Sequence, residues 1–209
     1  GHLQPHPYDY DAGEGVSPRH WDEYRVRKPT DEERRIQRLV ALMQMTYVGA
    51  PMIYYGTEAG MWGADDPCDR MPMVWPDLEY DPQVADPLGR PREPDTVEFD
   101  TKLHAYFDEA IRFRSQLPAL RYGKIEFVHA DDEAQFLAFR RWTDDSQVIV
   151  AFNRGDDAYQ WQAPLEPGQS LTQIFTASGE PEQHKVEANG STTVVTVPGL
   201  DGVILRLRD

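Results

Sequence analysis

Five charged side chains lie close together between residues 58 and 70. They follow the stretch APMIYYGTEAG at residues 50–60, and they are Glu58, Asp65, Asp66, Asp69 and Arg70. Carboxylates can act as general acids, general bases or nucleophiles, and a guanidinium beside them can hold the hydroxyl groups of a substrate. The first question is whether this cluster carries out a reaction or only binds the molecule that reacts.

The elements before the cluster predict where it lies in the fold. A capping box of Thr30 and Glu33 begins a helix whose apolar residues recur at helical spacing to about Tyr47. The short apolar run Pro51–Gly56 does not alternate, which is typical of a parallel strand covered on both faces. The charged residues would then follow the carboxyl end of a strand, where ligands bind in parallel α/β folds.

The remaining chain predicts a second, all-β part. Residues 1–29 and 76–97 are irregular and rich in proline, and a helix is predicted over residues 98–116. From Arg121 onward short apolar runs alternate with Asp- and Gly-rich turns, which is typical of an antiparallel sandwich. We therefore expect an α/β part over residues 1–120 and a β-sandwich over residues 121–209.

A single parallel strand cannot be stable alone, because its edges need hydrogen-bonding strands and its faces need cover. The later strands are predicted to pair with one another. We therefore expect residues 1–118 to be the tail of a domain whose larger part lies upstream.

Two motifs resemble a known family. Residues Gly49–Met61 resemble the eighth-strand motif of the α-amylase superfamily of glycoside hydrolases, G-x-P-x-I-Y-Y-G-x-E-x-G-M. Residues Asp66–Trp75 resemble D-P-D-C-R-x-P-M-x-W of its neopullulanase and cyclomaltodextrinase branch, with Cys68 and Asp69 in exchanged order and Met71 after the arginine. Residues 112–123 resemble the last barrel helix and the hinge into the C-terminal domain. The resemblance implies the C-terminal segments of a (β/α)₈ barrel followed by an antiparallel β-sandwich.

The resemblance also implies that the charge is not catalytic. Retaining glycoside hydrolysis uses two carboxyl groups roughly 5–5.5 Å apart. In this family the catalytic carboxylates follow the fourth, fifth and seventh strands, all upstream of residue 1, and no histidine here is followed by aspartate as in the family's third motif. We assign no catalytic residue and expect the chain alone to be inactive.

Substrate positioning is the role that the resemblance implies for Asp66 and Arg70, which would hold glucosyl hydroxyls. A carboxylate accepts hydrogen bonds from two hydroxyls while the guanidinium donates to others. The alternative is an Asp–Arg pair that only holds the loop. Trp62 is the third candidate, as a ring that stacks on a sugar, with core packing as its alternative.

Two functions are therefore compared. The first is the C-terminal part of a retaining α-glucan hydrolase acting on α-1,4 bonds of maltodextrins. The second is a non-catalytic carbohydrate-binding or interaction module that uses Trp142 and Trp161. The predicted strand at residues 50–55 favours the first, since a freestanding module has no use for it.

Composition limits the partners. The net charge of -15 argues against nucleic acid, and no apolar run approaches the roughly 20 residues of a membrane helix. A single cysteine, Cys68, excludes a cysteine-based zinc cluster, and we expect neither a metal nor a cofactor. The expected partners are an α-glucan oligosaccharide and the missing N-terminal portion of the same enzyme, with self-association left open. The acidic, lysine-poor composition is either ordinary or an adaptation to salt.

Overall fold

The computed structural model describes residues 26–63, 69–86, 88–181, 184–189 and 192–208. Contacts divide the chain into two units, which are described separately. The loop unit consists of residues 1–33 and 53–105, and the sandwich unit of residues 34–52 and 106–209. The elements in chain order are α1 (Asp31–Thr46), β1 (Gln83–Ala85), β2 (Pro91–Asp95), α2 (Thr101–Gln116), α3 (Pro118–Tyr122), β3 (Lys124–Asp131), β4 (Phe136–Trp142), β5 (Gln147–Asn153), β6 (Tyr159–Ala163), β7 (Ser170–Thr176), β8 (Lys185–Asn189), β9 (Thr192–Val197) and β10 (Asp201–Arg208).

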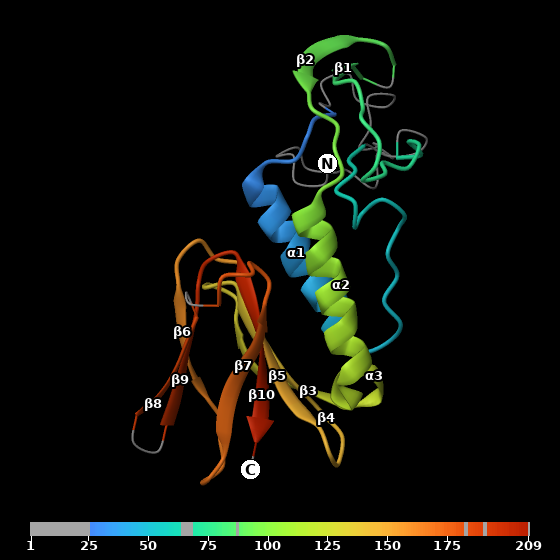
Figure 1. The fold of residues 1–209 in the computed structure, drawn as a ribbon. Helices are drawn as coiled ribbons and strands as arrows, with labels where there is room; N and C mark the ends of the chain where they lie inside the picture. The colour runs from blue at the N-terminus through green and yellow to red at the C-terminus, as the bar shows by residue number, and fades with distance from the viewer. Residues whose placement is uncertain (1–25, 64–68, 87, 182–183, 190–191, 209) are drawn as a thin grey trace, which may run out of the picture. The chain divides into compact units, whose positions relative to one another are not determined.

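The sandwich unit contains two antiparallel sheets (Figure 1). The larger has the order β3-β4-β5-β10-β7 and the smaller the order β6-β9-β8. Period-two alternation places one set of side chains from each sheet in a shared core. This core includes Phe136, Ile149, Trp161, Val195 and Leu205. The predicted all-β region is confirmed.

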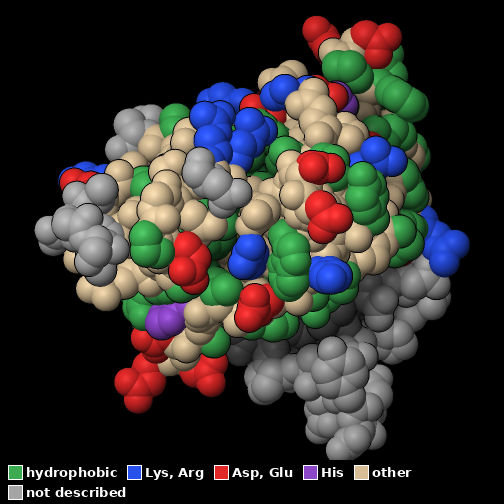
Figure 2. All heavy atoms as spheres, turned by 90° about the horizontal axis from the view of Figure 1, so that it is seen from below, with side chains coloured by type: hydrophobic (Ala, Val, Ile, Leu, Met, Phe, Trp, Pro, Cys, Tyr) green, Lys and Arg blue, Asp and Glu red, His purple; other side chains and the backbone are tan. Residues whose placement is uncertain are grey.

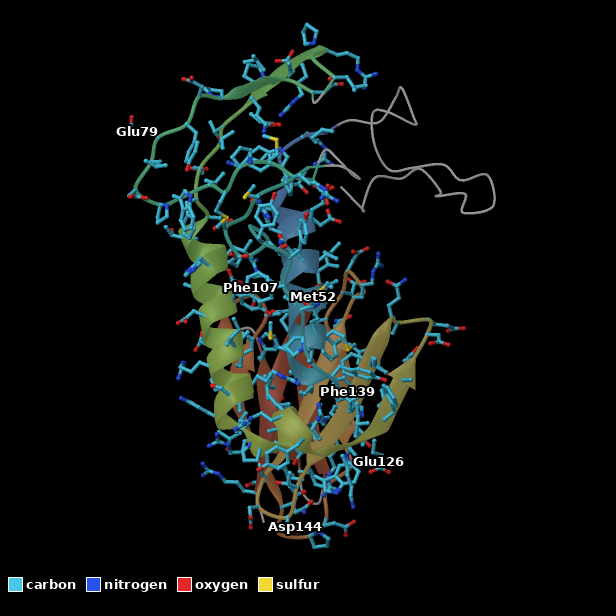
Figure 3. The ribbon with its side chains drawn as sticks, turned by 90° about the vertical axis from the view of Figure 1, so that its right-hand side faces the viewer. Met52, Glu79, Phe107, Glu126, Phe139 and Asp144 are labelled. Carbon is cyan, nitrogen blue, oxygen red and sulfur yellow. The ribbon has the colours of Figure 1, made fainter. Side chains whose placement is uncertain are left out.

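The opposite face of the larger sheet is also buried, beneath α1 and α2 (Figure 1). Phe175 on β7 makes ring contacts with Tyr106 at 5.4 Å and with Phe113 at 5.3 Å, both on α2. Gly202 on β10 faces α1, where an added Cβ would lie 2.9 Å from Leu39 and 2.8 Å from Leu42. Figure 3 labels Phe139, which is fully buried on this face. The sheet is therefore the middle layer of the unit, between the helices and the smaller sheet.

Two arginines from other elements hold the C-terminal end of α1. Arg114 on α2 donates to the carbonyls of Met45, at 2.7 Å, and Tyr47, at 3.2 Å, and Arg141 on β4 donates to that of Thr46. The last carbonyls of a helix lack intrahelical partners and carry partial negative charge. Since α1 has no basic residue in its last turn, these two side chains supply both hydrogen bonds and charge. Burial lowers the pKa of both guanidinium groups, and the charge of Arg114 adds to the effect on Arg141.

The parallel strand predicted at residues 51–56 is not formed among the described residues of this chain. The segment is extended without a strand partner and then enters turns, and Met52, Tyr54 and Tyr55 are 74%, 46% and 43% exposed. The physical reason is the absence of a neighbour: the strands of the described residues pair with one another in antiparallel fashion, which leaves none beside this segment. The chain by itself therefore shows no barrel.

The helices predicted at residues 30–47 and 98–116 are confirmed as α1 and α2. The irregular loop predicted over residues 76–97 is partly wrong, because it contains the hairpin β1–β2. Arg92 on β2 bonds to Gln83 on β1 at 2.8 Å and to Asp95 at 2.5 Å, so side-chain contacts stabilise a hairpin that shows little alternation.

Candidate functional site

The candidate site lies in the loop unit and begins with consecutive turns over residues 54–61. The amide of Met61 donates to the carbonyl of Gly56 at 3.0 Å, and that of Ala59 donates to the same carbonyl at 3.2 Å. Gly56 and Gly60 have φ values of +81° and +79°, which non-glycine residues rarely adopt. A Cβ on Gly56 would also lie 2.3 Å from the sulfur of Met61. The glycines of the motif are therefore required by the turn.

This turn is attached to the start of α2. The amide of Asp100 donates to the carbonyl of Ala59 at 3.0 Å, and Ala59 is fully buried. The side chain of Asp100 accepts a hydrogen bond from the amide of Leu103 at 2.9 Å, which satisfies one free amide of the helix. Residues 57–62 are thus held where α2 begins.

A second attachment is made by Lys28. Its ammonium donates to Glu98 at 2.7 Å and to Thr96 at 2.9 Å, and its backbone amide donates to Asp95 at 2.8 Å. Burial opposes ionisation of Asp95, but the hydrogen bonds from Lys28 and Arg92 outweigh it and lower the pKa of that carboxyl. The ammonium also lies 6.0 Å from the ring centroid of Trp62. Segments before α1, after β2 and after the turn therefore meet at this lysine.

Of the charged residues, the structure describes Glu58, Asp69 and Arg70, whereas Asp65 and Asp66 lie outside the described residues, as does Cys68. Burial, followed by the negative charge of Asp69, raises the pKa of Tyr54, and the charge of Arg70 acts in the opposite direction. The hydroxyl of Tyr55 donates to the carbonyl of Met71 at 2.8 Å. Asp69 and Met71, on either side of Arg70, therefore lie beside the two tyrosines at the start of the turns.

Three buried polar atoms of this loop have no hydrogen-bond partner among the described residues. They are Oε2 of Glu58, Nε1 of Trp62 and Oδ1 of Asp69, two acceptors and one donor. A buried polar group without a partner costs roughly 1–3 kcal/mol. Such atoms suit a partner with hydroxyl groups, because a hydroxyl both donates and accepts.

Trp62 was predicted to offer a face for stacking on a sugar. The structure leaves it half buried, with the ammonium of Lys28 over its ring. Lys28 and Tyr54 were missed by sequence reasoning, because their partners lie 15 to 70 residues away, and no local spacing reveals them.

The tryptophans of the sandwich unit are poorly placed for stacking. Trp161 is 4% exposed and packs in the core between the sheets. Arg140 lies over the ring of Trp142 at 5.2 Å. Within the described ranges no group of three or more His, Cys, Asp or Glu side chains is arranged to hold a metal ion. None of the helices described is long and apolar enough to cross a membrane.

Comparisons with known proteins agree with this architecture. Residues 127–208 match the family described as alpha amylase, C-terminal all-beta domain. Neopullulanase 2 of Thermoactinomyces vulgaris is 38% identical over 141 residues, which are 66% of this chain and 21% of that protein. A cyclomaltodextrinase of Geobacillus thermopakistaniensis is 32% identical over 162 residues, which are 77% of this chain and 23% of that protein. The chain thus spans about a fifth of the length of these relatives.

Solved structures show the same fold. The α-amylase from H. orenii superposes with a TM-score of 0.63 at 21% identity, over 84% of this chain and 36% of that one. A cyclomaltodextrinase superposes with a TM-score of 0.62 at 24% identity, over 84% of this chain and 26% of that one.

Proposed function

Because residues 127–208 match the C-terminal all-β domain of α-amylases and the relatives of the chain include a neopullulanase and a cyclomaltodextrinase, we propose that this chain is the C-terminal part of a retaining α-glucan hydrolase. The bonds cleaved are α-1,4-glucosidic bonds of maltodextrins. Neopullulanases and cyclomaltodextrinases are its relatives, and this supports α-glucans as the substrate class.

The observation that carries the proposal is the extended segment Pro51–Tyr55. It has no strand partner among the described residues, and it exposes Met52, Tyr54 and Tyr55. Exposed apolar side chains on an extended segment fit a strand that pairs with another part of the same protein. In this proposal residues 1–120 complete a (β/α)₈ barrel formed mainly by upstream residues, and residues 121–209 form the sandwich domain.

Asp66 and Arg70 hold glucosyl hydroxyls in this proposal, and the catalytic carboxylates lie upstream. The support is chemical: Arg70 lies near the carboxylate of Asp69 and the hydroxyl of Tyr54, and the same loop contains three buried polar atoms that lack partners. Hydrogen bonds from charged groups to sugar hydroxyls are directional and strong enough to fix a sugar ring. Since the catalytic carboxylates lie upstream in this proposal, the chain alone is inactive.

The experiment compares Arg70→Met and Asp66→Asn in the full-length enzyme, with maltodextrin and cyclodextrin as substrates. Each change should raise KM about 10-fold or more, because a hydrogen bond to a charged group contributes roughly 1.5–3 kcal/mol. The control is Arg112→Met, which alters a half-exposed arginine on α2.

An unchanged KM in both variants would show that Asp66 and Arg70 only hold the loop. Hydrolysis by the isolated 209-residue chain would contradict the assignment of catalysis to upstream residues. Binding of maltoheptaose by the isolated chain, together with inactivity of the full-length protein, would instead indicate a carbohydrate-binding module.

A further inference from the structure

We propose that Lys28 is a positioning residue for the substrate and that it acts through the indole of Trp62. This inference rests on the proposed function, because it requires that the loop containing Trp62 and Arg70 binds the sugar.

Lys28 is held more firmly than a surface lysine. A lysine side chain has a flexible four-carbon stem, and its ammonium is ordinarily free to turn. Here the ammonium donates to both Glu98 and Thr96, and the backbone amide of the same residue is fixed on Asp95. The side chain of Lys28 is 33% exposed, so two thirds of it is covered by the loop unit. The direction of the ammonium is therefore set by the segment between β2 and α2.

That direction takes the positive charge to the ring of Trp62, 6.0 Å from its centroid. A cation over an indole is attracted to the electron-rich face, and this attraction favours one orientation of the ring. Lys28 therefore lies on one face of the indole. The edge includes Nε1, a buried donor without a hydrogen-bond partner.

Trp62 lies in the chain between the turn and Arg70. On its N-terminal side lies the turn held by Gly56 and by the bond between Asp100 and Ala59. On its C-terminal side the chain continues to Arg70. An indole held in one orientation thus fixes the position of Trp62 at the end of the turn, and Lys28 contributes to affinity without touching the sugar.

A purely structural role makes a different prediction. If Lys28 only joins the start of α1 to the segment before α2 through Glu98, its removal should lower stability and leave KM unchanged. If Lys28 orients Trp62, its removal should raise KM in the enzyme that has Trp62. Its removal should leave KM unchanged in an enzyme that already lacks the indole.

The test is a double-mutant cycle of Lys28→Met and Trp62→Leu in the full-length enzyme, with maltodextrin hydrolysis and thermal unfolding measured for each variant. Lys28→Met should raise KM about five-fold with kcat changed less than about two-fold, as expected for a lost cation–π contact. Trp62→Leu should also raise KM, and the double variant should match Trp62→Leu alone, because interacting residues are not additive. Lys28→Arg keeps the charge and should restore KM to within about two-fold of the unaltered enzyme. Lys102→Met, at an exposed position in the first turn of α2, is the matched control and should change nothing.

Additive effects in the double variant, or an unchanged KM in folded Lys28→Met, would overturn the role of Lys28 while leaving the proposed function intact. If Lys28→Met does not fold, Lys28→Gln takes its place in the cycle and is judged by the same outcomes. An unaltered enzyme that neither binds nor hydrolyses α-glucan would overturn the proposed function and this inference together.

Discussion

The guanidinium of Arg141, on β4 of the sandwich, donates a hydrogen bond to the main-chain carbonyl of Thr46, the last residue of α1. Both residues are almost completely buried, at 1% and 0% exposure. The same guanidinium donates to the carbonyls of Gly123 at 3.0 Å and Lys124 at 3.2 Å, just after α3. One side chain thus joins the end of a helix, the start of the sandwich and its central sheet.

Replacing Arg141 by leucine should lower the free energy of unfolding by about 3–5 kcal/mol. The substitution removes the hydrogen-bond donor of three carbonyls, and each buried unsatisfied group costs roughly 1–3 kcal/mol. Urea unfolding followed by circular dichroism measures the loss, with Arg208→Leu at an exposed position of β10 as the control. A loss equal to that of the control would mean that water satisfies these carbonyls.

Gly123→Ala should be more destabilising than Gly202→Ala, by about 2 kcal/mol. A Cβ at position 123 would lie 2.3 Å from the carbonyl oxygen of Ala119 and 2.7 Å from that of Trp142, and backbone atoms cannot turn away. A Cβ at position 202 meets mainly the terminal carbons of Leu39 and Leu42, which can change rotamer. Thermal unfolding of both variants gives the comparison, and equal losses would contradict it.

Tyr106→Phe should cost about 1 kcal/mol, because it removes the donor to the partly buried carbonyl of Arg38, 2.7 Å away. Burial raises the pKa of this hydroxyl well above its usual range, so it remains a donor at any pH at which the fold is stable. The control is Tyr122→Phe, whose residue is 69% exposed and should show no change in urea unfolding. Equal stability of the two variants would show that the buried hydroxyl contributes nothing.

Glu33 should contribute to stability at neutral pH and not in strong acid. The hydrogen bond from Arg27 lowers its pKa from 4.5 to about 2. A carboxyl with a lowered folded-state pKa stabilises the fold above its unfolded pKa, and this contribution is lost as the pH falls from 4.5 toward about 2. Since Arg27 is 41% exposed, solvent screening limits the effect to about 1 kcal/mol.

The measurement for Glu33 is chemical unfolding from pH 7 to pH 2 with Glu33→Gln as the comparison. Glutamine can still form the capping box, so the difference isolates the charge. The two proteins should differ at pH 7 and converge in acid, and a difference that is constant with pH would contradict the linkage.

Unfolding measured against KCl tests whether the acidic composition is an adaptation to salt. With a net charge of -15, screening should raise stability as the Debye length falls from about 10 Å in 0.1 M salt to about 3 Å in 1 M salt.

On the face seen in Figure 2 the acidic side chains form several separate groups among basic and hydrophobic ones. Asp144 and Asp145 lie exposed in the turn between β4 and β5, where Figure 3 labels Asp144. Replacing both by asparagine should reduce the salt dependence. No gain in stability by molar salt would exclude adaptation.

The sequence by itself determined the elements whose causes are local. The capping box is formed as predicted, with Glu33 accepting from the amide of Thr30 at 2.7 Å and Thr30 accepting from that of Glu33 at 3.2 Å. Short apolar runs and Asp- and Gly-rich turns located the all-β part, whose strands β3 to β10 lie between Lys124 and Arg208. Their causes act over a few residues, which are visible in any window of the sequence.

Only the tertiary structure decided what depends on residues far apart. Pro51–Gly56 has the composition of a buried strand, but a strand exists only where neighbours accept its backbone hydrogen bonds. The helix α1 has no basic residue in its last turn, and the cations that hold its end come from positions 114 and 141. Lys28 meets Glu98 and Trp62 only after the loop unit has folded. The spacing of residues in the sequence does not reveal such contacts, because they form through packing and hydrogen bonds between distant residues.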